Sequence, residues 1–316
     1  MLSFGTDQEP FFPRLQRAGI PVLLCHYGLL QRWVYLQKLW RFDIIHIHSP
    51  GVLRTLLPLL PVLACKRVIY TIHGEVDPEL PLLKFAHRLY QPFIHAITAV
   101  SASSAQSTET RYGWNSAKIQ VIPNGVLVQD LENSHHSNTI KLGVVSRLIP
   151  LKNIKLLFQA LQQLPAVQRA QFELHIFGDG PCKAELESLS QQAGTPPTTF
   201  YGNVESEQDI FSAFDVLVMC SDTEGLPMSV IEAMSYGKPV VSTHVGAIPS
   251  VVASGENGWL YPPKDEAALA GILSELTKAS IQACSLNAKA VVAARFSIEA
   301  THKRFLALYQ SGRSHG

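Results

Sequence analysis

DVLVMCSDTEGLPMSVIEAMSYGKPVVSTH (residues 215–244) decides the fold class, because it holds a strand, a helix and a second strand in immediate succession. The short apolar runs at 215–221 and 238–244 are typical of buried parallel strands. Between them, Pro227 suits the first turn of a helix, where its missing N–H costs nothing, and Gly237 suits the position just past the helix end. The stretch therefore predicts one strand–helix–strand unit of a parallel sheet.

The same alternation continues along the whole chain. One of the helices is expected to begin at Asn153 as its N-cap, with an apolar face made of Ile154, Leu157, Phe158, Leu161 and Leu164. This rhythm predicts an α/β protein with two Rossmann-like, doubly wound domains, which place the carboxyl ends of their strands toward a shared cleft. The expected strands are 21–27, 43–49, 67–74, 96–102 and 119–126 in the first half, and 140–147, 172–180, 198–204, 215–221, 238–244 and 257–262 in the second.

The polar stretch VQDLENSHHSNT (128–139) separates the two halves and is expected to be the interdomain linker. We therefore expect an N-terminal domain at 1–135 and a C-terminal domain at 136–295. A last segment at 296–316 is expected to hold a helix.

Composition limits the classes of protein that fit. The chain has 316 residues, 47% of them apolar, and a formal net charge of +1, which gives no global electrostatic footprint for nucleic acid. Its cysteines are odd in number and have no ligand spacing, so reduced thiols in the core of a cytoplasmic protein are expected; they are Cys25, Cys65, Cys182, Cys220 and Cys284. No membrane-spanning run and no signal peptide is predicted.

Glu224 and Glu232 are the first candidate site residues. Glu224 is expected in the loop before the helix and Glu232 on the helix body, so two carboxylates lie around a helix start. The backbone N–H groups of such a loop suit phosphate or a sugar oxygen, while the carboxylates accept hydrogen bonds from hydroxyls. The alternative is that both are ordinary solvated acids.

Several motifs occur in a fixed order in the second half. They are GVVSRLIPLKN (143–153), HIFGDGP (175–181), FYGNV (200–204), EGLPMSVIEAMSYGKPVV (224–241) and GENGWLYPPKD (255–265). Over about 140–295 the chain resembles the donor domain of the family 4 retaining glycosyltransferases of the GT-B fold. The first half adds weaker matches in DIIHIHS (43–49), TIHG (71–74) and IPNGV (122–126). The resemblance implies that the domain at 1–135 is the acceptor-side domain, that the domain at 136–295 binds the nucleotide-sugar donor, and that the helix of 296–316 packs back on the N-terminal domain.

The resemblance implies a role for each matching residue. Arg147 and Lys152 would hold the diphosphate of a nucleotide sugar, Glu224 would approach the transferred sugar, and Glu232 would accept hydrogen bonds from the ribose. His73, in the first domain, would contact the donor sugar near the reacting centre. Further expected positions are Gly225, Leu226, Met228, Gly178, Gly180 and Val204 on the donor side and His48 on the acceptor side, where His46 is held as a second acceptor-side candidate. Gly178 and Gly180 equally suit a mere strand-to-helix turn.

The expected activity is transfer of a hexose from a nucleotide-diphosphate sugar, as co-substrate, to a saccharide or lipid-linked saccharide acceptor in surface polysaccharide or glycolipid synthesis. The resemblance implies retention of anomeric configuration by a front-face route. No metal is expected, because no Asp-x-Asp or His/Cys cluster is present and Arg147 with Lys152 can neutralise the leaving group. A nucleotide-sugar epimerase is disfavoured, because the Arg147/Lys152 and Glu224/Glu232 set matches transferases better.

The start of the chain departs from the family pattern. Family members usually begin with an earlier strand, a glycine-rich loop and a helix, whereas MLSFGTDQEPFFPRLQRAGIPVLLCHY (1–27) looks like an opening at the second strand. A truncated N-terminal domain is therefore expected. The alternative function that follows is a catalytically impaired remnant that binds nucleotide sugar.

A basic and aromatic region lies between Gly28 and Ile72. Such a surface would suit an anionic membrane, so peripheral contact with the inner face of the plasma membrane is expected. The alternative is that Leu36, Leu39 and Trp40 pack in the core and the cations are solvated. The cations are Arg32, Lys38, Arg41, Arg54, Lys66 and Arg67, interleaved with Trp33, Tyr35, Leu36, Leu39 and Trp40.

Overall fold

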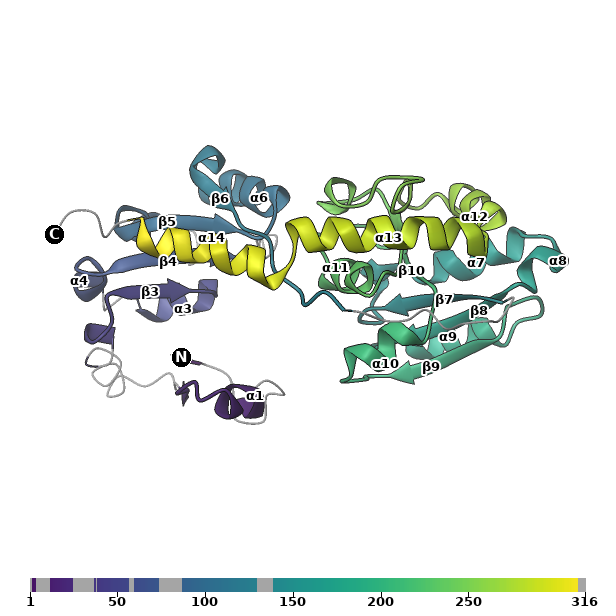
Figure 1. Ribbon diagram of the computed structural model, residues 1–316, viewed down its shortest axis with the longest axis horizontal. Helices are drawn as coiled ribbons and strands as arrows, with labels where there is room; N and C mark the ends of the chain where they lie inside the picture. Colours follow the sequence, from purple (N-terminus) through teal and green to yellow (C-terminus); the bar gives the residue numbers. More distant parts are fainter. Residues whose placement is uncertain are drawn as a thin grey trace. The chain divides into compact units, whose positions relative to one another are not determined.

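The computed structural model describes residues 2–3, 12–24, 37, 39–56, 60–73, 87–129 and 139–311 (Figure 1). The chain divides into two compact units, 1–121 and 122–316. The boundary expected at 135, and most of the expected linker, lie outside the described residues. Within them, each of the expected strands overlaps an observed one, although β5 (Ile94–Ala99) begins two residues before the expected 96–102.

The first unit contains a parallel sheet in the order β3-β4-β5-β6 and a separate parallel pair, β1 with β2. Its core lies between the sheet and its helices, with Val68, Tyr70 and Trp114 almost fully buried. The elements are β1 (Leu2–Ser3), α1 (Phe12–Arg17), β2 (Leu23–Leu24), β3 (Ile44–Ile47), α3 (Pro50–Leu56), α4 (Leu60–Leu63), β4 (Arg67–Ile72), η2 (Gln91–Phe93), β5 (Ile94–Ala99), α6 (Ala102–Tyr112), η3 (Ser116–Lys118) and β6 (Ile119–Val121).

The second unit is a six-stranded parallel sheet in the order β12-β11-β10-β7-β8-β9. Its chain runs through β7 (Ile140–Val145), η4 (Pro150–Lys152), α7 (Lys155–Gln163), α8 (Ala166–Arg169), β8 (Phe172–Phe177), α9 (Lys183–Ser190), β9 (Thr198–Gly202), α10 (Glu207–Ser212), β10 (Val216–Met219), α11 (Met228–Ser235), β11 (Val240–Thr243), η5 (Ile248–Ser250), β12 (Gly258–Tyr261), α12 (Glu266–Glu275), α13 (Lys278–Arg295) and α14 (Ile298–Gln310).

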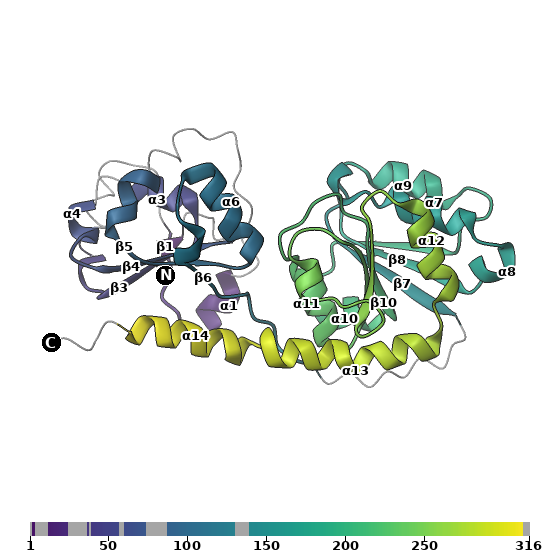
Figure 2. The ribbon, with the colours of Figure 1, turned by 90° about the horizontal axis from the view of Figure 1, so that it is seen from above.

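Helices cover both faces of this sheet, as the doubly wound prediction requires (Figure 2). Residues of α7, α9 and α12 fill one core layer, and residues of α10, α11 and α13 fill the other. The sheet order reverses between β7 and β10, because β8 lies on one side of β7 and β10 on the other. Ligands of open α/β sheets bind at such a reversal, outside the carboxyl ends of the strands.

Two helix boundaries differ from the sequence predictions. Pro227 is the N-cap residue of α11 rather than part of its first turn. The N-cap of α7 is Ile154 rather than Asn153. Asn153 instead ends η4 in the left-handed conformation, with φ 46°. The predicted apolar face of α7 is confirmed, since Ile154, Leu157, Phe158, Leu161 and Leu164 are all buried.

The cysteine prediction holds only in part. Cys220 and Cys284 are buried, whereas Cys65 is an exposed free thiol. Among the described residues, no helix is long and apolar enough to cross a membrane.

Gly246, in the loop after β11, packs directly against the loop that begins α11. It has φ 57°, and a Cβ at this position would overlap the carbonyl oxygen of Glu224. The N–H of Ala247 donates to the carbonyl of Gly225 at 2.9 Å. Gly246 therefore lets the two loops touch.

We expect Gly246→Ala to destabilise the protein more than Gly255→Ala. Both glycines have positive φ, so both variants carry a left-handed backbone cost of about 1–2 kcal/mol. Only Gly246→Ala adds a backbone overlap, because nothing lies within 4 Å of the Cβ position of Gly255. Urea unfolding should show at least ~1 kcal/mol of extra loss; equal losses in the two variants would contradict the loop contact.

Candidate functional site

The candidate site lies at the carboxyl ends of β7 and β10 in the second unit. Lys152, at the end of η4, forms an ion pair with Glu224 in the loop before α11. Both side chains are mostly buried, with exposures of 16% and 10%. The same carboxylate oxygen, Oε1 of Glu224, accepts a hydrogen bond of 2.7 Å from the buried hydroxyl of Ser221. Two of the predicted catalytic residues are thus in direct contact.

A small hollow opens between these two strand ends, and Lys152, Ser146 and Ser221 are among the residues that line it. A cation, two hydroxyls and the nearby carboxylate of Glu224 therefore meet where the sheet order reverses. This set can neutralise an anion and hydrogen-bond a hydroxyl-bearing ligand at the same time.

Arg147 follows β7 and is exposed. Among the described acidic residues, none forms an ion pair with it, so its guanidinium is available to an anion. The loop after β8 holds the Arg147 loop in place through two backbone hydrogen bonds of 2.9 Å. The N–H of Leu148 donates to the carbonyl of Asp179, and the N–H of Cys182 donates to the carbonyl of Leu148.

Gly178 and Gly180 make this loop contact sterically allowed. Their φ values are 120° and 156°, and a Cβ would overlap the carbonyl oxygen of Ser146 at Gly178 and that of Leu148 at Gly180. Both glycines therefore support the loop that carries Arg147, so the turn alternative explains their presence without any ligand contact.

Glu232 lies on α11, and its carboxylate has no hydrogen-bond partner among the described residues. Burial, followed by the nearby negative charge of Glu207, raises the pKa of Glu232 from 4.5 to about 7. A half-buried carboxylate without protein donors is well placed to accept hydrogen bonds from ligand hydroxyls.

The remaining donor-side predictions divide into two kinds. Leu226, Met228 and Val204 are partly buried and pack against the core layer beneath α10 and α11. Gly225 is half-exposed with open space around its Cβ position, so a side chain would fit there. Leu226 lies in the loop before α11 and Met228 is the first residue of α11, and neither side chain has a polar role.

The first unit holds a separate group of histidines at the carboxyl ends of β3 and β4. His48 Nδ1 and His73 Nε2 are 2.8 Å apart and share one hydrogen bond. His46 lies within β3, and its Nε2 is 2.6 Å from Thr71 Oγ1. The rings of His46 and His48 are 3.9 Å apart between centroids, so the two lie on one face of the strand end.

The histidines are held neutral. Burial, followed by the neighbouring imidazoles, lowers the pKa of His46 to about 3 and that of His48 to about 4. Burial also lowers the pKa of His73. The group therefore offers neutral donors and acceptors near pH 7.

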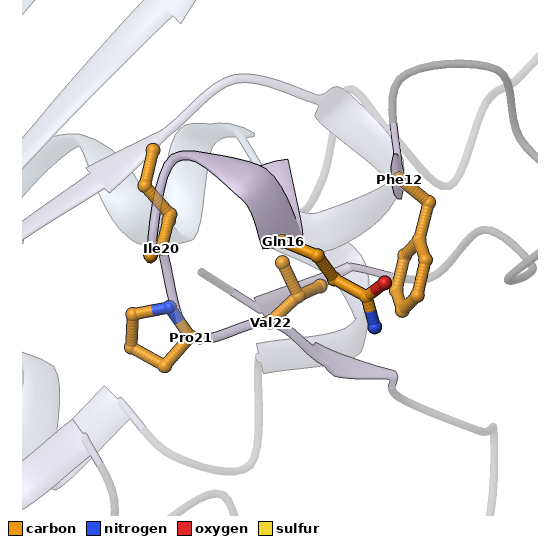
Figure 3. A pocket seen from close by; sticks show the side chains of 6 residues that line it. Phe12, Gln16, Ile20, Pro21 and Val22 are labelled. Carbon is orange, nitrogen blue, oxygen red and sulfur yellow. The ribbon is translucent and has the colours of Figure 1, made fainter. Parts of the chain in front are cut away.

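A larger hollow in the first unit lies beside α1 and is lined by Phe12, Gln16, Gly19, Ile20, Pro21 and Val22 (Figure 3). None of the predicted site residues contributes to its wall. Among the described residues, no group of three or more His, Cys, Asp or Glu is arranged to hold a metal ion.

Three residues at the site were missed by the sequence analysis. The hydroxyl of Ser221 donates a hydrogen bond to Glu224, and the carboxylate of Asp222 accepts one from Asn153. Gly246 lets its loop contact the backbone of Glu224. Of the three, only Gly246 could have been predicted from the sequence, because a glycine in a loop directly after a strand (GAIP, 246–249) often marks a close backbone contact. Nothing in the sequence pairs Asp222 with a residue 69 positions away.

We expect replacement of Glu232 by Gln to change the pH dependence of stability. Between about pH 4.5 and pH 7 the folded wild type keeps a proton that the unfolded chain releases, so this carboxyl makes the wild type less stable as pH rises. The free energy of unfolding of Glu232→Gln, relative to wild type, should therefore rise from pH 5 to pH 8 in urea titrations. The histidine contributions cancel in that difference, and a constant difference would disprove the buried carboxyl.

Some known proteins are similar to this chain in sequence, and some solved structures are similar to it in fold. Amylovoran biosynthesis glycosyltransferase AmsK of Erwinia amylovora is 27% identical over 84% of this chain and 68% of that protein. The putative colanic acid biosynthesis glycosyltransferase WcaL of Salmonella typhimurium is 31% identical over 53% of this chain, and the match spans only 44% of that protein's length. The crystal structure of Anabaena Alr3699/HepE in complex with UDP superposes with a TM-score of 0.83 at 23% identity, covering 95% of this chain and 89% of that one.

Two family descriptions cover the chain in succession. Residues 4–129 match glycosyltransferase family 4, and residues 129–292 match glycosyl transferases group 1. The second match covers more than half of the 316 residues and includes the Lys152–Glu224 pair. The parallel-sheet α/β units and the superposition on solved structures show the GT-B fold. The match over more than half of the chain shows that this protein belongs to the glycosyl transferases group 1 family.

Proposed function

We propose that this protein is a retaining glycosyltransferase that moves a hexose from a nucleotide-diphosphate sugar to a saccharide or lipid-linked saccharide acceptor. The curated relatives are named for colanic acid and amylovoran synthesis, which favours an acceptor in a growing surface polysaccharide or glycolipid. The solved complexes of Alr3699/HepE with UDP and with UDP-glucose make UDP-glucose the first donor to test.

The observation that carries the proposal is the cluster at the reversal point of the six-stranded sheet. Lys152 and Glu224 are paired there, and Arg147 projects from the same β7–α7 loop without an acidic partner among the described residues. Glu232, whose carboxylate has no hydrogen-bond partner among the described residues, lies on α11, about one turn after the start of that helix. Cations beside carboxyl groups suit a ligand that joins a diphosphate to hydroxyl-bearing sugar rings.

The proposed chemistry uses these charges directly. In transfer, the bond between the anomeric carbon and the phosphate oxygen breaks, and a bond from the acceptor hydroxyl oxygen to that carbon forms on the same face. The proton of the acceptor hydroxyl passes to the departing phosphate oxygen. Negative charge grows on the diphosphate, so Arg147 and Lys152 stabilise the transition state more than the ground state.

Arg147 and Lys152 supply the positive charge that the leaving group needs, so the proposal includes no metal or other cofactor. Glu224 would accept a hydrogen bond from the transferred hexose, and Glu232 would accept one from the ribose. Backbone groups of Gly225, Leu226 and Met228 would lie along the donor.

His73 would contact the transferred sugar, with His48 on the acceptor side. Both are neutral near pH 7, because burial lowers their pKa values. A neutral imidazole both donates and accepts, which suits a sugar hydroxyl.

A thermal-shift screen of nucleotide sugars, starting with UDP-glucose, tests the proposal. A bound donor at 100 times its dissociation constant should raise the free energy of unfolding by about 2.7 kcal/mol. Arg147→Ala should then lower kcat by about 100-fold or more, measured as donor hydrolysis or as transfer to an acceptor extract.

Lys155→Ala is the matched control, because the side chain of Lys155, the first residue of α7, is 51% exposed and pairs with the exposed Glu185 of α9. It should leave turnover unchanged. Wild-type turnover in Arg147→Ala would contradict the phosphate role, and the absence of any stabilising nucleotide sugar would contradict the function.

We further propose that the enzyme works in the cytoplasm at an anionic membrane, through Trp40, Phe42 and Lys66. Trp40 and Phe42 are 58% and 60% exposed, whereas Leu39 beside them is buried, so only part of the core alternative holds. The ammonium of Lys66 lies 5.1 Å from the Trp40 ring centroid and donates to the Trp40 carbonyl at 2.8 Å. Arg32, Trp33, Tyr35, Leu36 and Lys38 lie outside the described residues, as does the side chain of Arg54.

Liposome sedimentation tests this contact. Wild type should sediment with phosphatidylserine-containing liposomes at low salt and be released at high salt, since surface charge is screened. A Trp40→Ala/Phe42→Ala variant should lose most of the binding, and Leu286→Ala, which removes an isolated exposed side chain of α13, should not. Failure of the wild type to sediment at either salt concentration would remove the membrane proposal.

A further inference from the structure

Asp222 lies where the loops after β7, β10 and β12 meet. Its carboxylate Oδ1 accepts a hydrogen bond of 3.1 Å from Asn153 Nδ2, and its Oδ2 is 3.7 Å from the ammonium of Lys264. Its backbone N–H donates to the carbonyl of Leu151 at 3.0 Å. One residue of the β10–α11 loop is therefore bonded twice to the segment that carries Lys152.

These two bonds fall on either side of Lys152. Leu151 precedes it and is bonded through its carbonyl, while Asn153 follows it and is bonded through its side chain. Asp222 itself comes two residues before Glu224, the partner of Lys152 in the ion pair. The backbone on both sides of the cation is therefore fixed to the same loop that presents the carboxylate.

The position of the Lys152 charge depends on both ends of its side chain. Its ammonium is a point charge on a flexible four-carbon stem, so a fixed backbone and the ion pair with Glu224 together decide where the charge lies. η4 is a three-residue turn whose own backbone bonds are Lys152 N–H to Ile149 O and Asn153 N–H to Pro150 O. Turns of this kind are short and have poor hydrogen-bond geometry.

Asn153 also fixes the backbone by its own conformation. Its φ of 46° is left-handed, a region that asparagine tolerates better than most residues. The left-handed turn ends η4 and lets α7 begin at Lys155, and it also aims the amide of Asn153 at Asp222.

We propose that Asn153 and Asp222 form a positioning pair that holds Lys152 opposite Glu224; the inference rests on the proposed function, in which Lys152 neutralises the leaving diphosphate. Neither residue touches the reacting atoms. They act through Lys152, by keeping its ammonium where charge develops.

The first test is Asn153→Gly, which keeps the left-handed backbone at no cost and removes only the side-chain bond. We expect kcat to fall about tenfold, because a hydrogen bond to a charged group contributes roughly 1.5–3 kcal/mol and 1.4 kcal/mol corresponds to a factor of ten. The midpoint of thermal unfolding should fall by no more than a few degrees, because the same bond also stabilises the fold. Lys264→Ala is the matched control: it removes the other, 73% exposed partner of Asp222 and should leave kcat unchanged.

The second test asks whether the effect passes through Lys152. Asn153→Gly should have no further effect on residual turnover in a Lys152→Ala background, whereas a purely structural role would reduce turnover in both backgrounds. A partner exchange, Asn153→Asp with Asp222→Asn, should recover most of the turnover that Asn153→Asp alone loses, because the bond reforms with its donor and acceptor reversed and aspartate also tolerates the left-handed region.

The outcomes separate the inference from the function on which it rests. Absence of turnover by wild type with every nucleotide sugar tested overturns the proposed function. A wild type that turns over while Asn153→Gly matches its kcat overturns the positioning pair alone, as does an equal loss in the Lys152→Ala background. Amide hydrogen exchange gives a readout that needs no activity: the Asp222 N–H should exchange faster in Asn153→Gly than in wild type, and an unchanged rate would also overturn the pair.

Discussion

The ion pair between Lys152 and Glu224 joins two loops that are 72 residues apart in sequence, and the arrangement of the candidate site depends on it. Both side chains are mostly buried, so each requires the other: a buried charge without a partner is strongly destabilising. The pair forms because β7 and β10 are hydrogen-bonded neighbours, and parallel neighbours end at the same edge of the sheet. The sheet order thus brings the cation of one loop to the carboxylate of the other.

Close backbone contact, rather than side-chain packing, holds the neighbouring loops around this pair. Gly178 and Gly180 let the β8–α9 loop touch the β7–α7 loop, and Gly246 lets the β11–η5 loop touch the loop of Glu224. Each contact exists only because a Cβ is missing at that point. Arg147, Lys152 and Glu224 therefore sit on short loops that are fixed from behind, as a site that must hold charges in one geometry requires.

Each unit holds titratable groups whose pKa values are shifted toward the uncharged form. Burial raises the pKa of Glu232 to about 7 and lowers the pKa of His48 to about 4. These shifts cost the folded protein stability relative to solvated groups, and shifted groups of this kind gather at functional sites. Neutral imidazoles, which both donate and accept hydrogen bonds, and a carboxyl group without protein donors suit the hydroxyl groups of a sugar.

The sequence by itself determined the α/β class, the strands of both sheets and the buried face of α7, because the alternation of apolar runs is a local property. It also singled out Lys152 and Glu224 through a family resemblance, without showing that they touch. The tertiary structure alone decided that contact, the left-handed turn at Asn153 and its bond to Asp222. The physical reason is that each of these depends on loops brought together by the strand order, and on backbone angles that are stable only when a distant loop supplies the hydrogen-bond partner.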